Sequence, residues 1–143
     1  MATYNKFTGT TSGVDMMVKA MNASSDTYKV YLTNAVSATD VTYNTGTTLE
    51  ITAGSGYTAG GATCTTVSAT TTSGTFKLIL SLPSPTWTAS GAVGPFRYAV
   101  LYDSTTATNN LIGYWDYGSS ISMASGDTFT VTLDATNGVF QVT

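Results

Sequence analysis

Apolar and polar residues alternate along most of the chain, and this period of two predicts β-strands. The longest run, 76–82, places four apolar side chains on one face: Phe76, Leu78, Leu80 and Leu82. In the run 127–133, threonines alternate with apolar residues, which is the pattern of a half-buried strand. Similar runs, separated by turn-forming residues, cover 28–33, 47–52, 63–70, 96–102, 110–117 and 138–143. Eight or nine short strands predict an all-β fold, an antiparallel β-sandwich of the jelly-roll type.

The N-terminal part of the chain departs from this period. Residues 1–11 show no clear pattern and are predicted to form an extended N-terminal arm. Near 13–22, apolar residues at i, i+3, i+4 and i+7 predict one short helix, whose apolar stripe is Val14, Met17, Val18 and Met21. A chain of 143 residues fits one domain. Residues 12–143 are therefore predicted to be a single β-sandwich domain that includes the helix.

Turn chemistry and charge predict two hairpins. Asn137-Gly138 accepts the positive φ angles of a tight turn and is predicted to join the last two strands. The runs 96–102 and 110–117 are predicted to form a second antiparallel hairpin, with Tyr102 opposite Leu111. This register places Arg97, the single arginine, opposite Asp116 as a structural ion pair, and Tyr98 opposite Trp115.

The composition is poor in charge and rich in hydroxyl groups. Charged residues make up 9% of the chain and the net charge is −3. Ordinary globular proteins carry about 25% charged residues. Here 30 threonines and 15 serines provide much of the polar surface. The five basic residues are scattered, so a nucleic-acid partner is not expected.

The residues needed for common catalytic and metal sites are missing. There is no histidine, which removes the usual general base and the Ser-His-Asp arrangement. The single Cys64 excludes an intrachain disulfide and a multi-thiolate metal site. The glycine-rich stretch 54–61 lacks the Lys-Ser/Thr of a phosphate loop. Asp103 and Asp116 could flank a sugar, but turn and ion-pair roles fit them better. We expect no enzyme activity, cofactor or bound metal.

The N-terminal residues and the apolar runs give no targeting signal. The first ten residues lack the basic and apolar regions of a secretory signal, and every apolar stretch is too short to span a bilayer. Neither a membrane partner nor export is expected.

Several segments resemble a family of small virion proteins of tailed bacteriophages. The similarity covers the opening MATYNKFTGT, the strand SDTYKVYLTN, the segment GYTAGG at 56–61 and most of the C-terminal half. Within that half, FRYAVLY at 96–102 and LIGYWDYG at 111–118 are the most specific. The segment GVDMMVKAMNASS departs from the family by being shorter and richer in methionine. Family members are generally held to be capsid decoration or cement proteins, and no catalytic residues belong to the family.

The resemblance implies a non-enzymatic virion structural protein that is assembled in the host cytoplasm. Its partners would be the major capsid protein, on the outer surface of the capsid, and copies of itself, with a trimer expected. Aromatic residues are favoured at interfaces, and the candidate capsid or subunit contacts are Tyr4, Phe7, Tyr43 and Tyr57. The alternative is a tail- or fibre-associated protein that binds a host surface glycan through Trp87, Trp115 or loop tyrosines. A different virion connector or a cellular surface-layer protein remains a third reading.

Overall fold

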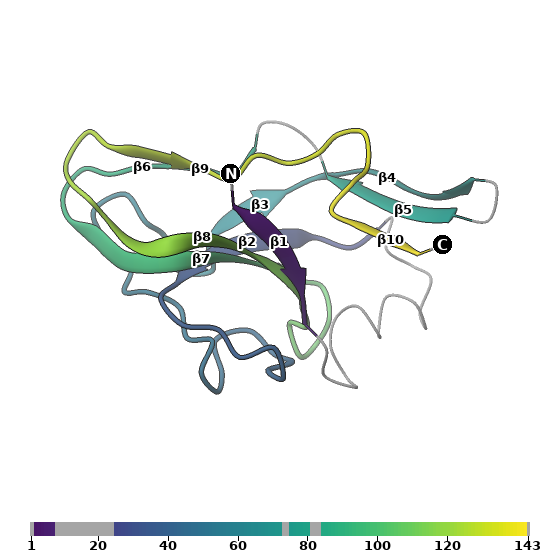
Figure 1. The fold of residues 1–143 in the computed structure, drawn as a ribbon, viewed down its shortest axis with the longest axis horizontal. Coiled ribbons are helices and arrows are strands. Elements are labelled where there is room, and N and C mark those ends of the chain that lie inside the picture. Colours follow the sequence, from purple (N-terminus) through teal and green to yellow (C-terminus); the bar gives the residue numbers. More distant parts are fainter. Residues whose placement is uncertain (1, 8–24, 73–74, 81–83, 143) are drawn as a thin grey trace.

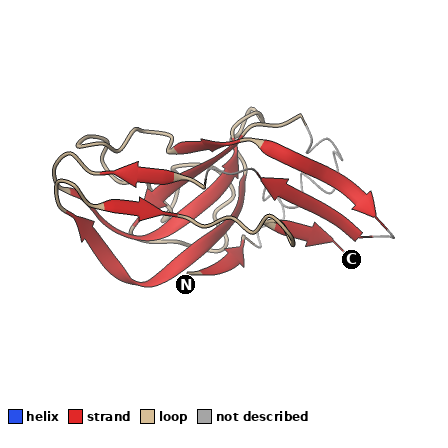
Figure 2. Ribbon diagram, turned by 90° about the horizontal axis from the view of Figure 1, so that it is seen from above, coloured by secondary structure: helices blue, strands red, loops and turns tan. Residues whose placement is uncertain are grey.

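The computed structural model describes residues 2–7, 25–72, 75–80 and 84–142. This part of the chain is all-β with antiparallel sheets, as the alternation predicted, and Figure 2 shows its strands and loops. The helix predicted near 13–22 lies outside the described residues. The strands are β1 (Thr3–Lys6), β2 (Tyr28–Thr33), β3 (Ala62–Cys64), β4 (Thr66–Thr72), β5 (Thr75–Leu80), β6 (Thr86–Thr88), β7 (Val93–Asp103), β8 (Leu111–Met123), β9 (Thr128–Thr130) and β10 (Phe140–Val142).

The strands form one large sheet and two small ones. The large sheet has the order β1-β8-β7-β2-β3, and every neighbouring pair in it is antiparallel. A three-stranded sheet has the order β10-β5-β4, and β6 pairs with β9. In Figure 1, the β6–β9 pair lies above the long β7–β8 hairpin, and the β4–β5 hairpin extends to the right beside β10.

One face of the large sheet packs against the two small sheets and forms the main core. Fully buried residues of the large sheet, such as Val30, Phe96 and Ile112, contact a second layer that includes Leu78, Trp87, Val131, Leu133 and Phe140. Each fully buried aliphatic or aromatic side chain contributes about 1.5–3 kcal/mol through removal from water. This interior joins strands that are distant in the sequence.

The opposite face of the large sheet is covered by the first part of the loop 34–61, whereas Ile51 and Tyr57 of the same loop pack into the main core. A second core cluster lies there and contains Phe7, Tyr31, Val100, Tyr102 and Leu111, with Val36 and Tyr43 of the loop packed against it. In Figure 1 this loop is the blue chain below the sheet. Because both faces are covered, the middle strands do not alternate: five of the six residues of β2 are buried, and so are the last five of β7.

Asp40 holds the loop 34–61 in shape. Its Oδ2 accepts hydrogen bonds from the backbone N–H groups of Thr47 and Thr48 at 3.0 and 2.8 Å, and from the Thr48 hydroxyl at 2.7 Å. Within the loop, Asn44 and Gly46 have positive φ angles, as in a tight turn. The run 47–52, predicted to be a strand, makes isolated bridges instead, such as Thr33 to Glu50. The alternating apolar residues of this run pack a loop onto the sheet and do not form a strand.

Two further predictions need correction. Residues 3–6 are extended, but they pair with β8 as the edge strand of the large sheet and are not an arm apart from the domain. The Asn137-Gly138 turn forms, with Asp134 accepting from the backbone N–H groups of Thr136 and Asn137 at 2.8 and 2.9 Å. It does not join a hairpin, because β9 pairs with β6 and β10 pairs with β5.

Candidate functional site

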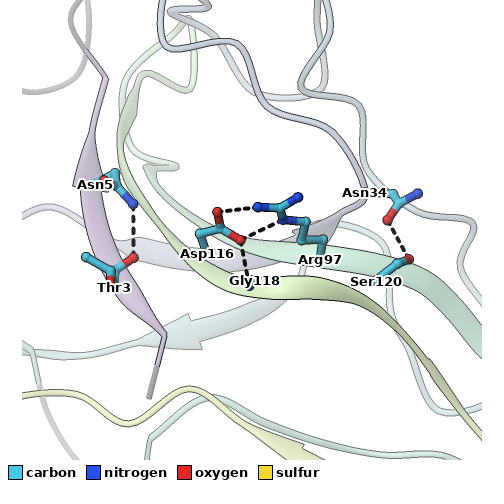
Figure 3. A network of polar contacts seen from close by, with 7 residues as sticks. All are labelled: Thr3, Asn5, Asn34, Arg97, Asp116, Gly118 and Ser120. Atoms are coloured by element: carbon cyan, nitrogen blue, oxygen red, sulfur yellow. Dashed lines mark hydrogen bonds and ion pairs between the residues drawn. The ribbon is translucent and has the colours of Figure 1, made fainter.

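Arg97 and Asp116 form a two-pronged ion pair in the β7–β8 hairpin (Figure 3). The guanidinium Nε and Nη2 donate to Oδ1 and Oδ2 of the carboxylate at 2.7 and 2.8 Å. The backbone N–H of Gly118 also donates to Oδ1, at 2.8 Å. The Arg97 hydrogen bond is the largest of the effects that lower the pKa of Asp116, so the carboxylate stays ionised well below neutral pH.

The register of this hairpin differs from the predicted one by one residue over most of its length. Tyr102 lies opposite Leu111 as predicted, but an irregularity follows and Asp116 lies opposite Tyr98. A second irregularity, between residues 96 and 98, displaces Arg97 from the regular ladder. Its side chain reaches Asp116 diagonally and places its guanidinium carbon 5.0 Å from the centre of the Tyr98 ring.

A cleft of about 390 Å³ opens between the β1–β8–β7 side of the large sheet and the chain that starts at β9. Tyr117 is 53% exposed and lies where the cleft meets solvent, whereas Trp115 is 8% exposed and forms part of the wall. The lining residues are Ala2, Tyr4, Arg97, Ala99, Trp115, Tyr117, Phe129, Thr130, Val131, Thr132, Asp134, Gly138 and Val139. Arg97 thus lines part of an aromatic cleft, whereas its partner Asp116 lies opposite Tyr98, which packs on the other face of the sheet.

The four aromatic residues predicted to contact other subunits pack largely within the chain itself. Phe7 is buried beside Tyr114, with ring centres 5.4 Å apart. The Tyr4 ring lies 4.9 Å from that of Trp115, and its hydroxyl is buried with no hydrogen-bond partner among the described residues. Burial raises the pKa of Tyr4. The N-terminal strand is anchored by these two side chains.

The other two predicted contact residues, Tyr43 and Tyr57, are hydrogen-bonded to Glu50, the single glutamate of the chain. Its Oε1 accepts from the Tyr57 hydroxyl at 2.6 Å and from the backbone N–H of Gly60 at 2.8 Å, and its Oε2 accepts from the Tyr43 hydroxyl. The Tyr57 oxygen also accepts from the backbone N–H of Leu32 at 3.0 Å. Buried tyrosine hydroxyls need such partners, so Tyr43 and Tyr57 fix the loop to the sheet.

The remaining carboxylates do not converge on a reaction centre. Asp103 is buried at the end of β7, where its Oδ1 accepts from the backbone N–H of Thr105 at 2.8 Å. Burial, followed by the nearby charge of Asp103, raises the pKa of Asp26. Within the described residues, no group of three or more Asp, Glu, Cys or His side chains is arranged to hold a metal ion. The same residues include no helix of a length and hydropathy that could cross a membrane.

Sequence reasoning missed two residues that shape these sites. Tyr117 was not distinguished from its neighbours Tyr114 and Trp115, because the alternation of β8 did not show where the strand leaves the core. Glu50 lies seven residues from both Tyr43 and Tyr57. A single glutamate between two tyrosines is a signal that could have indicated a hydrogen-bonded cluster.

Comparison with known proteins gives no relative. No family model matches the chain, and neither a curated protein nor a solved structure is significantly similar to it.

Proposed function

We propose that the protein is a virion structural protein, a decoration or cement protein that binds and stabilises the outer surface of a phage capsid. One structural observation supports this proposal most strongly. The two segments that most specifically resemble the phage family, 96–102 and 111–118, pair with each other in β7 and β8 of the large sheet. Residues that resemble the family thus build the centre of the fold, where substitutions are least tolerated.

The physical properties of the domain suit that role. Both faces of the large sheet are covered, and the loop 34–61 is held by Asp40 and Glu50. Exposed threonines of β6 and β9 face one another, with the hydroxyls of Thr86 and Thr130 2.9 Å apart. A rigid body with a hydroxyl-rich surface is suited to many weak contacts on a particle, which repetition turns into firm attachment.

The finer features of the fold and assembly belong to the same proposal. We expect a jelly-roll-like β-sandwich that assembles as a homo-oligomer, with a trimer matching the threefold positions of a capsid lattice. Because Tyr4, Phe7 and Tyr57 pack within the chain, contacts with the major capsid protein are better sought around Leu49. This residue lies on the loop 34–61 and is 53% exposed.

An add-back experiment tests the proposal. Purified protein is mixed with phage heads that lack it, with complete particles and with isolated tails, and each mixture is sedimented. Decoration predicts that the protein sediments with the heads, saturates at a fixed number of copies and raises the temperature at which they rupture. Sedimentation with tails alone would contradict it.

A tail- or fibre-associated protein that binds a host glycan is the second proposal. The exposed Tyr117 beside the cleft favours it. The predicted platforms do not, since Trp87 and Trp115 are 5% and 8% exposed and cannot present a ring face to a sugar.

A further inference from the structure

The edge strands of the three sheets differ in how well they are protected from pairing with another chain. Strands β3, β6, β9 and β10 have only three residues each. The four-residue β1 contains Lys6, and its Thr3 carbonyl accepts a hydrogen bond from the side chain of Asn5 at 3.1 Å. Short length and lysine are among the features that keep sheet edges from adding foreign strands. Five of the six edge strands in the described part of the chain are therefore poor templates.

Strand β4 is the exception, because it is both long and unprotected. It has seven residues, Thr66–Thr72, and contains neither a charged residue nor a proline. It pairs with β5 on one side, and no other described strand pairs with its second side. The irregularity in its register lies between Thr66 and Ser68, which leaves 68–72 as a regular stretch. An edge of this kind is a site at which another β-strand can add.

The β4–β5 hairpin is held in place from its inner face. Ala69 of β4 and Phe76 of β5 pack against the main core, to which the buried Leu78 and Leu80 of β5 belong. Figures 1 and 2 show the hairpin extending past the large sheet, with β10 on the side away from β4. The outer edge of β4 thus keeps its shape through packing within the chain.

The charges of the hairpin are compatible with a second copy of the same strand. Between residues 66 and 80 the only charged residue is Lys77 on β5, which lies opposite Thr70. If two β4 strands pair, the two β5 strands are three strand spacings apart, about 14 Å. Because the Debye length is about 8 Å at physiological salt, the two Lys77 side chains repel each other little.

The residues of β4 also suit pairing with themselves. In an antiparallel pair of the regular stretch 68–72, every residue faces a serine, an alanine or a threonine of the other copy. Facing hydroxyl-bearing residues are among the pairs that stabilise antiparallel strands. Each other edge strand offers four residues or fewer, so β4 forms its longest ladder with another β4.

We propose that β4 pairs antiparallel with β4 of a second copy about a twofold axis near Thr70. The two three-stranded sheets then become one six-stranded sheet. Such a contact uses the same surface on both copies and closes on itself. Neighbouring local threefold positions of an icosahedral shell are related by local twofold axes, so the contact can link the trimers proposed above. That placement rests on the proposed function, whereas the contact itself does not.

Sedimentation velocity and ¹⁵N amide spectra of the whole chain, over about a hundredfold range of concentration, test the pairing. Association should be weak and reversible, because one ladder buries less area than a stable dimer interface. The amide signals of residues 68–72 should shift as concentration rises, and those of β1 and β10 should not. A protein that stays monomeric at about 1 mM, or shifts that map to another edge, would overturn the proposal.

Charge variants at the proposed axis give the second test. Thr70→Lys and Thr70→Glu each bring like charges together there, and each should weaken association about tenfold or more. An equal mixture of the two should restore association, because opposite charges then meet. Failure of the mixture to associate would contradict the twofold pairing.

Thr88→Lys is the matched control, since it adds the same charge at an exposed position of another edge strand, β6. This variant should associate as the parent does, and weakening equal to that of Thr70→Lys would overturn the proposal. The concentration-dependent shifts of the unaltered protein decide the question even where a variant does not fold. All measurements are made without capsids, so attachment to heads is judged separately.

Discussion

The ring of Tyr4 on β1 occupies the space that a β-carbon at Gly113 on β8 would fill. A β-carbon built on Gly113 would overlap the hydroxyl oxygen and two ring carbons of Tyr4. The two strands are neighbours, with Lys6 opposite Gly113 and Tyr4 opposite Trp115. The glycine thus lets the N-terminal strand lay an aromatic ring flat across the sheet.

Gly113→Ala should therefore lower the free energy of unfolding, by about 1–3 kcal/mol, because it overpacks a buried site. Without the clash, alanine would stabilise a strand relative to glycine, so the sign of the change is diagnostic. Urea unfolding measures it. Ser119→Ala, at an exposed position of the same strand, should change stability by less than about 0.5 kcal/mol. A Gly113→Ala protein as stable as the parent would contradict the contact.

Tyr4→Phe should leave stability unchanged or raise it by about 1 kcal/mol. The Tyr4 hydroxyl is buried with no hydrogen-bond partner among the described residues, and such a group carries a desolvation cost that phenylalanine avoids. Thermal and urea unfolding of both proteins give the comparison. A loss of more than about 1 kcal/mol would show that the hydroxyl has a partner.

Glu50→Gln should destabilise the protein by about 1–3 kcal/mol, because hydrogen bonds to a carboxylate are stronger than those to an amide and one amide group cannot accept all three. Tyr43→Phe removes one of these bonds alone. In the double variant the two effects should be non-additive, since both residues share one cluster. Strict additivity in urea unfolding would contradict the shared cluster.

Asp26→Asn should stabilise the protein at neutral pH by at most about 1 kcal/mol, since Asp26 is only partly buried. The pKa of Asp26 is raised on folding, so the native state holds its proton to higher pH than the unfolded chain. Stability linked to this group is therefore complete below the unfolded value, near about 3.9, and falls as pH rises. The gain from asparagine should shrink in acid, as unfolding at several pH values will show.

Asp116→Asn serves as a control, because its effect on the free energy of unfolding should have the opposite sign at neutral pH. The pKa of Asp116 is lowered on folding, so the stability that it contributes is present above the unfolded value and is lost as pH falls. Asparagine should therefore destabilise the protein at neutral pH, and the difference should vanish in acid. If both variants respond to pH in the same direction, the assigned surroundings of these two carboxyls are incorrect.

The strands with strong local patterns could be predicted from the sequence, and so could the β7–β8 hairpin. Alternation locates a strand because successive side chains of a strand point to opposite faces of the sheet. The pairing of Arg97 with Asp116 followed from their being the single arginine and a carboxylate on neighbouring strands. The irregularities between them were not predictable, since a bulge depends on how both strands pack. Trp115 accordingly lies opposite Ala99 and not opposite Tyr98.

Partners distant in the sequence were the main source of error. Residues 3–6 have too short a pattern to show that they pair with β8, more than a hundred residues away. The Asn137-Gly138 turn has the right chemistry, but turn residues do not determine which strands they connect. The cleft depends on the same long-range arrangement, because Tyr117 and Phe129 meet across two sheets. Its existence could not be read from the sequence.

Electron microscopy of intact particles tests the central claim most directly. A reconstruction at a resolution that separates β-strands should show this fold on the outer surface of the capsid, repeated at equivalent lattice positions, with the loop around Leu49 facing the major capsid protein. A shell without such density, with the fold found on the tail or a fibre, would contradict the decoration role.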